Sequence, residues 1–216
     1  MAAGGIEARY LVVSGPPASG KTTIARGLAD ELGWSIVAKD TIKSALRSAL
    51  PVADVDTSRH VGRAAVMVLL AVASEIREGA VLEAVWRQDQ GRDAVSRLPG
   101  PIVEVFCRCD RPTLEARYAT RSRPSGYVPE HRDPSELWSS ETFEPVAGGW
   151  PVIEVDTAEA VDFLALVDEV REALAYREEV EEDADTGRFA IFRSGHSGAL
   201  GVADPIRRSD AWPRRT

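Results

Sequence analysis

The segment Ser14–Thr23 reads SGPPASGKTT and contains the spacing Gly15-x-x-x-x-Gly20-Lys21-Thr22. Glycines let the backbone wrap closely around phosphates, so that successive N–H groups and a helix N-terminus face the anion. A lysine in this position can reach the outer phosphates, and the hydroxyl that follows can bind Mg²⁺. The segment predicts a Mg²⁺-nucleotide site formed by Gly15, Pro16, Pro17, Ala18, Ser19, Gly20, Lys21, Thr22 and Thr23.

A carboxylate, Asp40, follows the apolar segment 34–38, which is typical of a buried strand. Ligands of an open parallel sheet bind beyond the carboxyl ends of its strands, so we expect Asp40 at the edge that carries the phosphates. A carboxylate there can accept the proton of an attacking hydroxyl, a contribution of about 10² to 10⁴ in rate. Alternatively, Asp40 caps the helix that begins at Thr41. The residues alone leave both interpretations open.

Glu83, in VLEAVW, ends a third predicted strand. An acid in that position can hold a Mg²⁺-bound water or orient a substrate, and the alternative is a solvent-facing strand residue. Arg87 follows four residues later and is assigned with Asp40, Lys43 and Glu83 to the acceptor side of the site. The alternative for Arg87 is an ordinary surface arginine.

Three arginines follow the fourth predicted strand, namely Arg117, Arg121 and Arg123. An arginine beside a transferring phosphoryl group can be worth about 10³ to 10⁵ in rate, because it neutralises charge that spreads over the phosphoryl oxygens. We assign Arg117 to nucleotide binding, and Arg121 and Arg123 to catalysis. The alternative is that these are solvated charges that complement the helix dipole.

The elements that would position these residues alternate along the chain. Short apolar runs predict strands at 10–14, 34–38, 80–86, 102–109 and 151–156. Apolar residues at helical spacing predict helices at 20–32, 41–50, 59–78, 90–97, 113–121 and 158–176. This alternation predicts an α/β fold with a parallel sheet covered on both faces.

Composition limits the class of protein. The chain has 216 residues, 44% of them hydrophobic, which suits one domain of ordinary size at 8–176. Its net charge of −8 makes a nucleic-acid partner unlikely without excluding one. We expect a cytoplasmic location without a membrane segment, and reduced thiols at Cys107 and Cys109.

Two parts of the chain differ from the predicted core. Residues 117–149 include a long proline-containing stretch that predicts a lid, with Tyr127 and Trp138 either as stacking surfaces for an acceptor or as packing. Residues 177–216 begin with an acidic run and mix glycine, serine and arginine. We expect this extension to be peripheral or partly disordered.

Four stretches together resemble a known group of enzymes, over about residues 8–175: GPPASGKTT, AKDTIKSAL, VLEAVW and CRCDRPTLEARYATRSR. They look like the small P-loop kinases similar to chloramphenicol phosphotransferase and to the kinase domain of polynucleotide kinase, and more distantly like zeta-type toxins. The resemblance implies a five-stranded parallel sheet of the nucleoside monophosphate kinase class with a lid. It also implies that Asp40 is the base and that Lys21, Thr22 and the arginine cluster bind phosphates. Glu83 departs from the group, where an aspartate is common.

The resemblance favours an ATP-dependent O-phosphotransferase that acts on a hydroxyl of a small molecule, with Mg²⁺ as cofactor. An antibiotic or nucleoside-like natural product is the acceptor that the resemblance suggests, which would be a resistance-type modification. The alternatives are a 5′-hydroxyl polynucleotide or nucleoside kinase and, in another class, a non-catalytic nucleotide-binding regulator or ATPase. The motifs specify neither the acceptor nor the oligomeric state, and they do not separate ATP from GTP.

Overall fold

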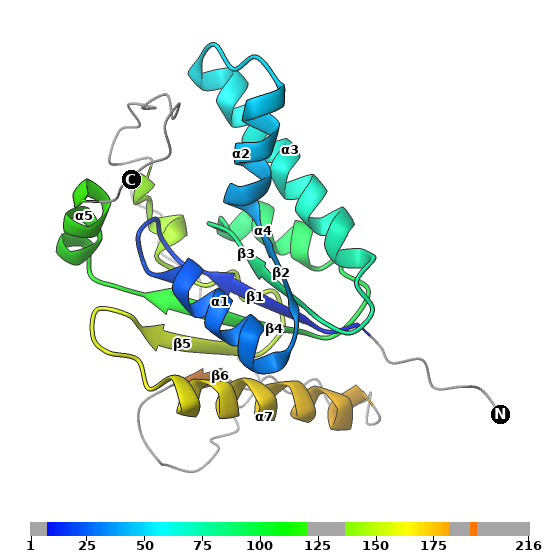
Figure 1. Cartoon of the computed structure of the whole chain (residues 1–216). Helices are drawn as coiled ribbons and strands as arrows, with labels where there is room; N and C mark the ends of the chain where they lie inside the picture. Colours follow the sequence, from blue (N-terminus) through cyan, green and yellow to red (C-terminus); the bar gives the residue numbers. More distant parts are fainter. Residues whose placement is uncertain (1–7, 121–136, 182–190, 194–216) are drawn as a thin grey trace, which may run out of the picture.

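The computed structural model describes residues 8–120, 137–181 and 191–193, and its centre is a parallel β-sheet (Figure 1). The strands are β1 (Tyr10–Ser14), β2 (Ser35–Ala38), β3 (Ala80–Glu83), β4 (Ile102–Arg108), β5 (Val152–Asp156) and β6 (Ile191–Arg193). The helices are α1 (Lys21–Leu32), α2 (Lys39–Ala49), α3 (Val55–Ser74), α4 (Gln88–Val95), α5 (Arg111–Thr120), α7 (Phe163–Glu181) and the 3₁₀ turn η1 (Ser140–Thr142). The strand order is β2-β3-β1-β4-β5-β6.

The predicted fold class is confirmed, because all five expected strands are present and every strand pair is parallel. The sheet has one strand more than the sequence indicated. Strand β6 lies in the extension 177–216 and pairs with the outer edge of β5, with Val152 opposite Ile191. Helix α7 also continues five residues past the predicted end of the domain, to Glu181.

Five helix starts differ from the predicted ranges by two residues or more. Helices α4 and α5 begin two residues early, at Gln88 and Arg111, and α7 begins five residues late, at Phe163. The starts of α2 and α3 relate to their N-cap residues. Helix α3 begins at Val55, earlier than the predicted residue 59, because the Asp54 carboxylate accepts a hydrogen bond from the Thr57 N–H at 2.7 Å. The hydrogen bonds from Thr57 lower the pKa of Asp54. Helix α2 begins at Lys39, two residues before the predicted start, with Ala38 as its N-cap.

Each face of the sheet buries its own layer of apolar side chains. Successive residues of β1 point to opposite faces: Leu11 and Val13 pack with α1 and α7, whereas Tyr10 and Val12 pack on the side of α3 and α4. Figure 1 shows the same arrangement, with α1 and α7 in front of the sheet and α3 and α4 behind it. Strands covered on both faces read as continuous apolar runs, which is why they were recognisable in the sequence.

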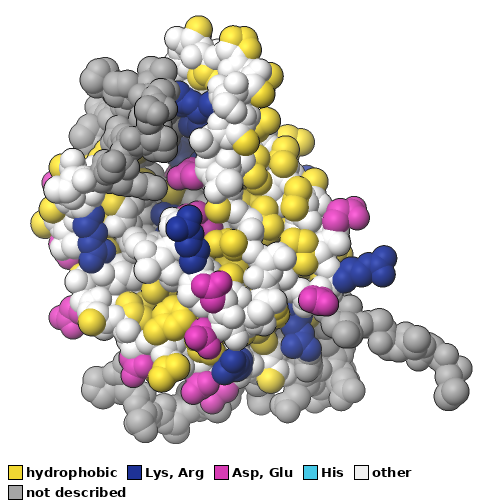
Figure 2. Space-filling model, viewed as in Figure 1, with side chains coloured by type: hydrophobic (Ala, Val, Ile, Leu, Met, Phe, Trp, Pro, Cys, Tyr) yellow, Lys and Arg dark blue, Asp and Glu magenta, His cyan; other side chains and the backbone are white. Residues whose placement is uncertain are grey.

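Helices α2 and α3 form a pair that stands out from the sheet (Figure 1). None of the residues of α2 is buried. Helix α3 buries one face and leaves an apolar stripe exposed, where Met67 is 72% exposed and Val72 is 46% exposed. Figure 2 shows hydrophobic side chains gathered over this part of the molecule.

Candidate active site

The predicted phosphate loop connects β1 directly to α1. Gly15 has a φ of 133° and Gly20, the N-cap of α1, has a φ of 81°; both values favour glycine. A Cβ at Gly15 would lie 2.5 Å from the Cys107 carbonyl oxygen, so no larger residue fits without displacing backbone. Ala18 also has a positive φ, 68°, which is uncommon for a residue with a side chain. Such strained conformations cluster at functional sites.

Two carbonyls of the loop are held by side chains from elsewhere in the fold. The Trp138 indole Nε1 donates to the Pro17 oxygen at 3.3 Å. The Thr157 hydroxyl lies 2.7 Å from the Ser19 oxygen, and 2.9 Å from the oxygen of Arg108. Because the carbonyl and N–H of a trans peptide point in opposite directions, the N–H groups that follow Pro17 and Ser19 face away from these donors. With the first turn of α1, they are backbone donors of the kind that bind phosphate in other proteins.

Two polar side chains of the loop are buried. Residue Lys21 is 6% exposed. Its ammonium donates to the Pro16 carbonyl oxygen at 2.9 Å, which holds the side chain against the loop. The Ser19 hydroxyl has no hydrogen-bond partner within the described part of the chain. A phosphate oxygen in the loop would supply an acceptor for it. Of the neighbouring hydroxyls, Thr22 is half-buried and Thr23 is exposed.

Three adjacent strands end at the same level of the sheet. Val13 of β1 and Ala38 of β2 both pair with Glu83 of β3. With neighbouring strands about 4.8 Å apart, Glu83 lies between the strand that carries the phosphate loop and the strand that leads to Asp40. Glu83 is only 5% exposed, so the alternative of a solvent-facing strand residue is wrong. Its carboxylate is an oxygen ligand of the kind that Mg²⁺ prefers.

Asp40 lies in the first turn of α2 and does not end β2, which stops at Ala38. The alternative that Asp40 caps the helix is therefore wrong, since the N-cap is Ala38 and makes no side-chain cap. The Asp40 side chain is 67% exposed, and its Oδ1 atom lies 4.0 Å from the Lys39 ammonium. A carboxylate in this first turn complements the helix dipole while staying open to a ligand.

Helix α2 carries two cations on the side that faces α3. Lys43 is half-buried, and a Cβ at Gly62 of α3 would lie 4.0 Å from its Nζ atom. Arg47, which the sequence analysis did not single out, donates from Nη1 to the buried Ser58 hydroxyl at 3.2 Å. The sequence could have indicated Arg47, because it follows Lys43 by four residues and this spacing places both side chains on one face of a helix.

The predicted arginines are placed unequally. Arg117 is half-buried and donates from Nη2 to the Thr157 carbonyl oxygen at 2.8 Å, so it contacts the residue whose hydroxyl supports the phosphate loop. Arg87 is exposed and is the N-cap residue of α4. Arg121 and Arg123 lie outside the described residues.

Trp138 packs behind the phosphate loop. Its ring makes an edge-on contact with Tyr118 of α5, with centroids 5.4 Å apart, while its N–H binds Pro17. Of the two interpretations offered for Trp138, packing agrees with these contacts; Tyr127 lies outside the described residues. Thr157, which sequence reasoning missed, directly follows β5 and could have been found as a polar residue at the carboxyl end of a strand.

Both cysteines are free and buried, as expected. Burial raises the pKa of the Cys107 thiol to about 12, the nearby charges of Lys21 and Glu83 being smaller influences. Burial also raises the pKa of Cys109. The two thiols are therefore protonated at neutral pH and serve as packing residues around the loop.

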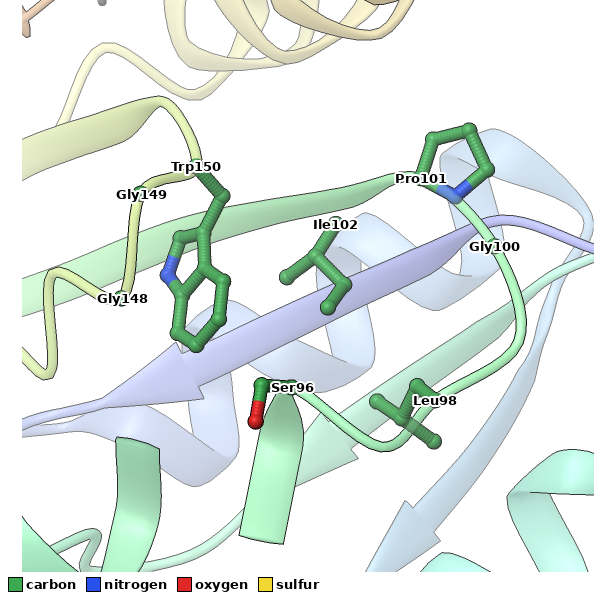
Figure 3. Close-up of a pocket in the computed structure, with 8 residues that line it drawn as sticks. All are labelled: Ser96, Leu98, Gly100, Pro101, Ile102, Gly148, Gly149 and Trp150. Carbon is green, nitrogen blue, oxygen red and sulfur yellow. The ribbon is translucent and has the colours of Figure 1, made fainter. Parts of the chain in front are cut away.

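A depression of about 290 Å³ lies at the opposite end of the sheet (Figure 3). It surrounds the start of β4 and the residues before β5, far along the strands from the phosphate loop. Its walls are mostly apolar or glycine: Ser96, Leu98, Gly100, Pro101, Ile102, Gly148, Gly149 and Trp150. The site of interest is therefore the loop edge of the sheet and not this depression.

Comparison with solved structures supports the fold. A protein of Chloroflexus aurantiacus J-10-fl assigned as a kinase is 27% identical, with a TM-score of 0.68 over 81% of this chain and 99% of the other. A gluconokinase from Sinorhizobium meliloti 1021 is 20% identical, with a TM-score of 0.53 over 82% and 97% of the two chains. A shikimate kinase from Acinetobacter baumannii is 16% identical, with a TM-score of 0.51 over 80% and 95%. The last two show the fold alone.

Comparison with curated proteins gave no match. In the part of the chain that the structure describes, no helix is long and apolar enough to cross a bilayer. The AAA_33 family, described as an AAA domain, matches residues 11–137, which begin in β1 and extend past α5. The chain therefore belongs to the AAA_33 family of P-loop proteins, and its domain is of the kinase type.

Proposed function

We propose that this protein is an ATP-dependent O-phosphotransferase that transfers the γ-phosphoryl group of ATP to a hydroxyl of a small molecule. The observation that supports this most is the arrangement of the sheet edge. The phosphate loop follows β1, the buried Glu83 ends β3, and the exposed Asp40 lies in the helix that follows β2; these three strands are adjacent in the order β1-β3-β2. The loop strand and β2 are two strand spacings apart, or about 10 Å, which leaves room for a phosphoryl group and an acceptor hydroxyl.

Asp40 is proposed as the general base. Its carboxylate takes the proton of the acceptor hydroxyl while the hydroxyl oxygen bonds to the γ-phosphorus. The bond from that phosphorus to the β,γ-bridging oxygen breaks, and ADP leaves with the electron pair. The 67% exposure of Asp40 supports this role, because a base must be reachable by its substrate.

The remaining proposed roles concern charge. Lys21 neutralises the outer phosphates, and Thr22 and Glu83 supply oxygen ligands for Mg²⁺, which lowers the charge of the nucleotide when bound. Arg117 is proposed to bind the nucleotide. From their place in the sequence, Arg121 and Arg123 are proposed to stabilise the transferring phosphoryl group.

The acceptor side is proposed to include Lys43 and Arg87 with Asp40 and Glu83. The resemblance to chloramphenicol phosphotransferase suggests an antibiotic or a nucleoside-like natural product. The fold shared with a gluconokinase and a shikimate kinase agrees with a small-molecule acceptor.

The test is a panel of hydroxyl compounds with Mg²⁺ and ATP, read by mass spectrometry for an added phosphoryl group. The panel includes aminoglycoside and phenicol antibiotics, nucleosides, sugar acids and a 5′-hydroxyl oligonucleotide. Phosphorylation of the oligonucleotide alone would replace the proposal by a polynucleotide kinase. Phosphate release without any modified acceptor would replace it by an ATPase.

The role of Asp40 is tested with Asp40→Asn on the acceptor that the panel identifies. We expect the transfer rate to fall by about 10² to 10⁴ while the Kd of Mg·ATP stays within twofold. Asp56→Asn is the matched control, because Asp56 is an exposed aspartate in the first turn of α3. Equal rates for the wild type and Asp40→Asn would contradict the proposed base.

A further inference from the structure

Glu104 is a fully buried carboxylate in the middle of the sheet. It belongs to β4, is 0% exposed, and pairs with Val12 of β1 on one side and with Val152 of β5 on the other. A carboxylate without solvent is costly unless it is hydrogen-bonded, so its partners must account for its presence. Nothing in the sequence marked Glu104 as more than a strand residue.

Four donors surround this carboxylate, two on each oxygen. Oε1 accepts from the Ser14 hydroxyl at 2.5 Å and from the Val146 N–H at 2.8 Å. Oε2 accepts from the Ala147 N–H at 3.0 Å and from the Trp150 indole N–H at 3.1 Å. These four bonds use the full accepting capacity of a carboxylate, and they come from two different parts of the chain.

One of those parts is the start of the phosphate loop. Ser14 is the last residue of β1, is 1% exposed, and precedes Gly15. Gly15 has no room for a side chain, since a Cβ there would lie 2.5 Å from the Cys107 carbonyl oxygen. The hydroxyl of Ser14 therefore holds the loop at the point where it leaves the sheet.

The other part is the segment Val146–Trp150, which leads into β5. Ala147 and Gly149 have φ values of 46° and 97°, and a Cβ at Gly148 would lie 2.2 Å from the Trp150 ring. The segment is thus wrapped tightly around the carboxylate. It is also tied to α4 by Arg92, whose Nη2 donates to the Val146 oxygen at 3.2 Å.

We propose that Glu104 is a positioning residue for the nucleotide site, acting through Ser14. Its carboxylate joins the start of the phosphate loop to the segment Val146–Trp150, so that the loop N–H groups are held in the arrangement that binds phosphate. Anion recognition by backbone N–H groups needs placement within about 0.5 Å, and the supporting hydrogen bonds provide that precision. The inference depends on one part of the proposed function, namely that the loop binds Mg·ATP.

The first test compares Ser14→Ala with Ser58→Ala. Both serines are 1% exposed and each substitution removes a side-chain hydroxyl that makes a hydrogen bond, but Ser58 lies in α3 and accepts from Arg47. Calorimetry with Mg·ATP at 25 °C is expected to show a Kd about threefold to tenfold higher for Ser14→Ala and within twofold of wild type for Ser58→Ala. Circular dichroism at the same temperature verifies that each variant is folded. A Ser14→Ala Kd within twofold of wild type would overturn the proposal, because a purely structural hydrogen bond changes the melting temperature and not the Kd.

The second test asks whether the two parts are coupled through the carboxylate. Trp150→Phe keeps an aromatic ring but removes the indole N–H that donates to Oε2, together with part of the ring volume. We expect the Ser14→Ala effect on the Kd to change by about twofold or more in the Trp150→Phe background, since both donors share one carboxylate. Effects that simply multiply would overturn the coupling. Glu104→Gln, which keeps the shape but turns an amide NH₂ toward two donors, should weaken Mg·ATP binding at least as much as Ser14→Ala.

These measurements need no acceptor. If the acceptor panel fails while Ser14→Ala weakens Mg·ATP binding, the proposed function is wrong and the role of Glu104 stands. If acceptors are phosphorylated and Ser14→Ala binds Mg·ATP normally, the proposed function stands and the role of Glu104 is wrong.

Discussion

The donor and acceptor sides of the candidate site are built differently. The phosphate loop begins where Ser14 donates to the Glu104 carboxylate and where Gly15 packs against the Cys107 carbonyl. Two of its own carbonyl oxygens accept hydrogen bonds from Trp138 and Thr157. Helix α2, which carries Asp40, has no buried residue. The proposed donor side is therefore supported by the core, whereas Asp40 of the proposed acceptor side lies on an exposed helix.

The largest expected difference between the two sides is in amide hydrogen exchange. Helix α1 buries five residues, Lys21, Ile24, Ala25, Leu28 and Ala29, and α2 buries none. Because local opening follows the number of buried contacts, we expect amides in the middle of α2 to exchange about 100-fold faster than those of α1. Mass spectrometry of the free protein measures both. Equal protection would mean that α2 is as firmly held as the donor side.

A second measurement of amide hydrogen exchange, in saturating Mg·ATP, tests the same comparison of α1 with α2. Binding should slow exchange in the first turn of α1 more than in α2, because the proposed contacts to the nucleotide lie on the donor side. A larger effect on α2 would instead connect the nucleotide to the acceptor helix.

A smaller effect is expected from glycine substitutions on the donor side. Gly15→Ala meets the Cys107 carbonyl oxygen at 2.5 Å, whereas Gly33→Ala, at the other end of α1, meets no heavy atom within 4 Å. Both positions have a positive φ, 133° at Gly15 and 67° at Gly33, so Gly33→Ala shows the cost of a left-handed backbone without a steric contact, about 1 kcal/mol. We expect Gly15→Ala to lower the free energy of unfolding by about 2 kcal/mol more than Gly33→Ala. Urea unfolding measures this difference. Equal losses would show that the start of the loop is not tightly packed.

The smallest effect concerns Cys107 beneath the loop. Its thiol has a pKa of about 12 in the folded protein and of about 9 when exposed, so above pH 9 the unfolded chain releases a proton that the folded chain keeps. Stability should be unaffected below pH 9 and fall between pH 9 and 12. From pH 8 to 10, the wild type should lose about 1 kcal/mol more than Cys107→Ala. Parallel curves for the two proteins in urea unfolding would contradict the burial of this thiol beneath the loop.

Much of the fold was accessible from the sequence because its signals are local. Apolar runs marked β1 to β5. Four of these strands, β1, β3, β4 and β5, are buried along most of their length, where no alternation is needed. Strand β6 was missed, because three residues carry too little pattern and their pairing with β5 depends on a distant part of the chain. The start of α2 was placed two residues late because Ala38, with no capping side chain, gives no signal.

The candidate site could be predicted only in part, because only some of its residues belong to a local sequence pattern. The phosphate loop is a contiguous motif, and Asp40 and Glu83 could be placed because parallel strands end at one edge. Trp138 and Glu104 support that loop from far along the chain, and neither their types nor their spacing indicates it. Thr157 has the signal of a polar residue directly after a strand, but its contact with Ser19 does not follow from that signal. Contacts between distant segments have no local pattern.

The sequence by itself determined that this chain forms a parallel sheet with a phosphate loop after the first strand, because both follow from the order of residues in short segments. Only the tertiary structure decided that Glu83 is buried between the loop strand and the Asp40 strand, and that Glu104 joins Ser14 to Trp150. Strand order and side-chain burial arise when distant segments pack together. The physical reason is that a buried carboxylate is stable only where the whole fold brings enough donors to it.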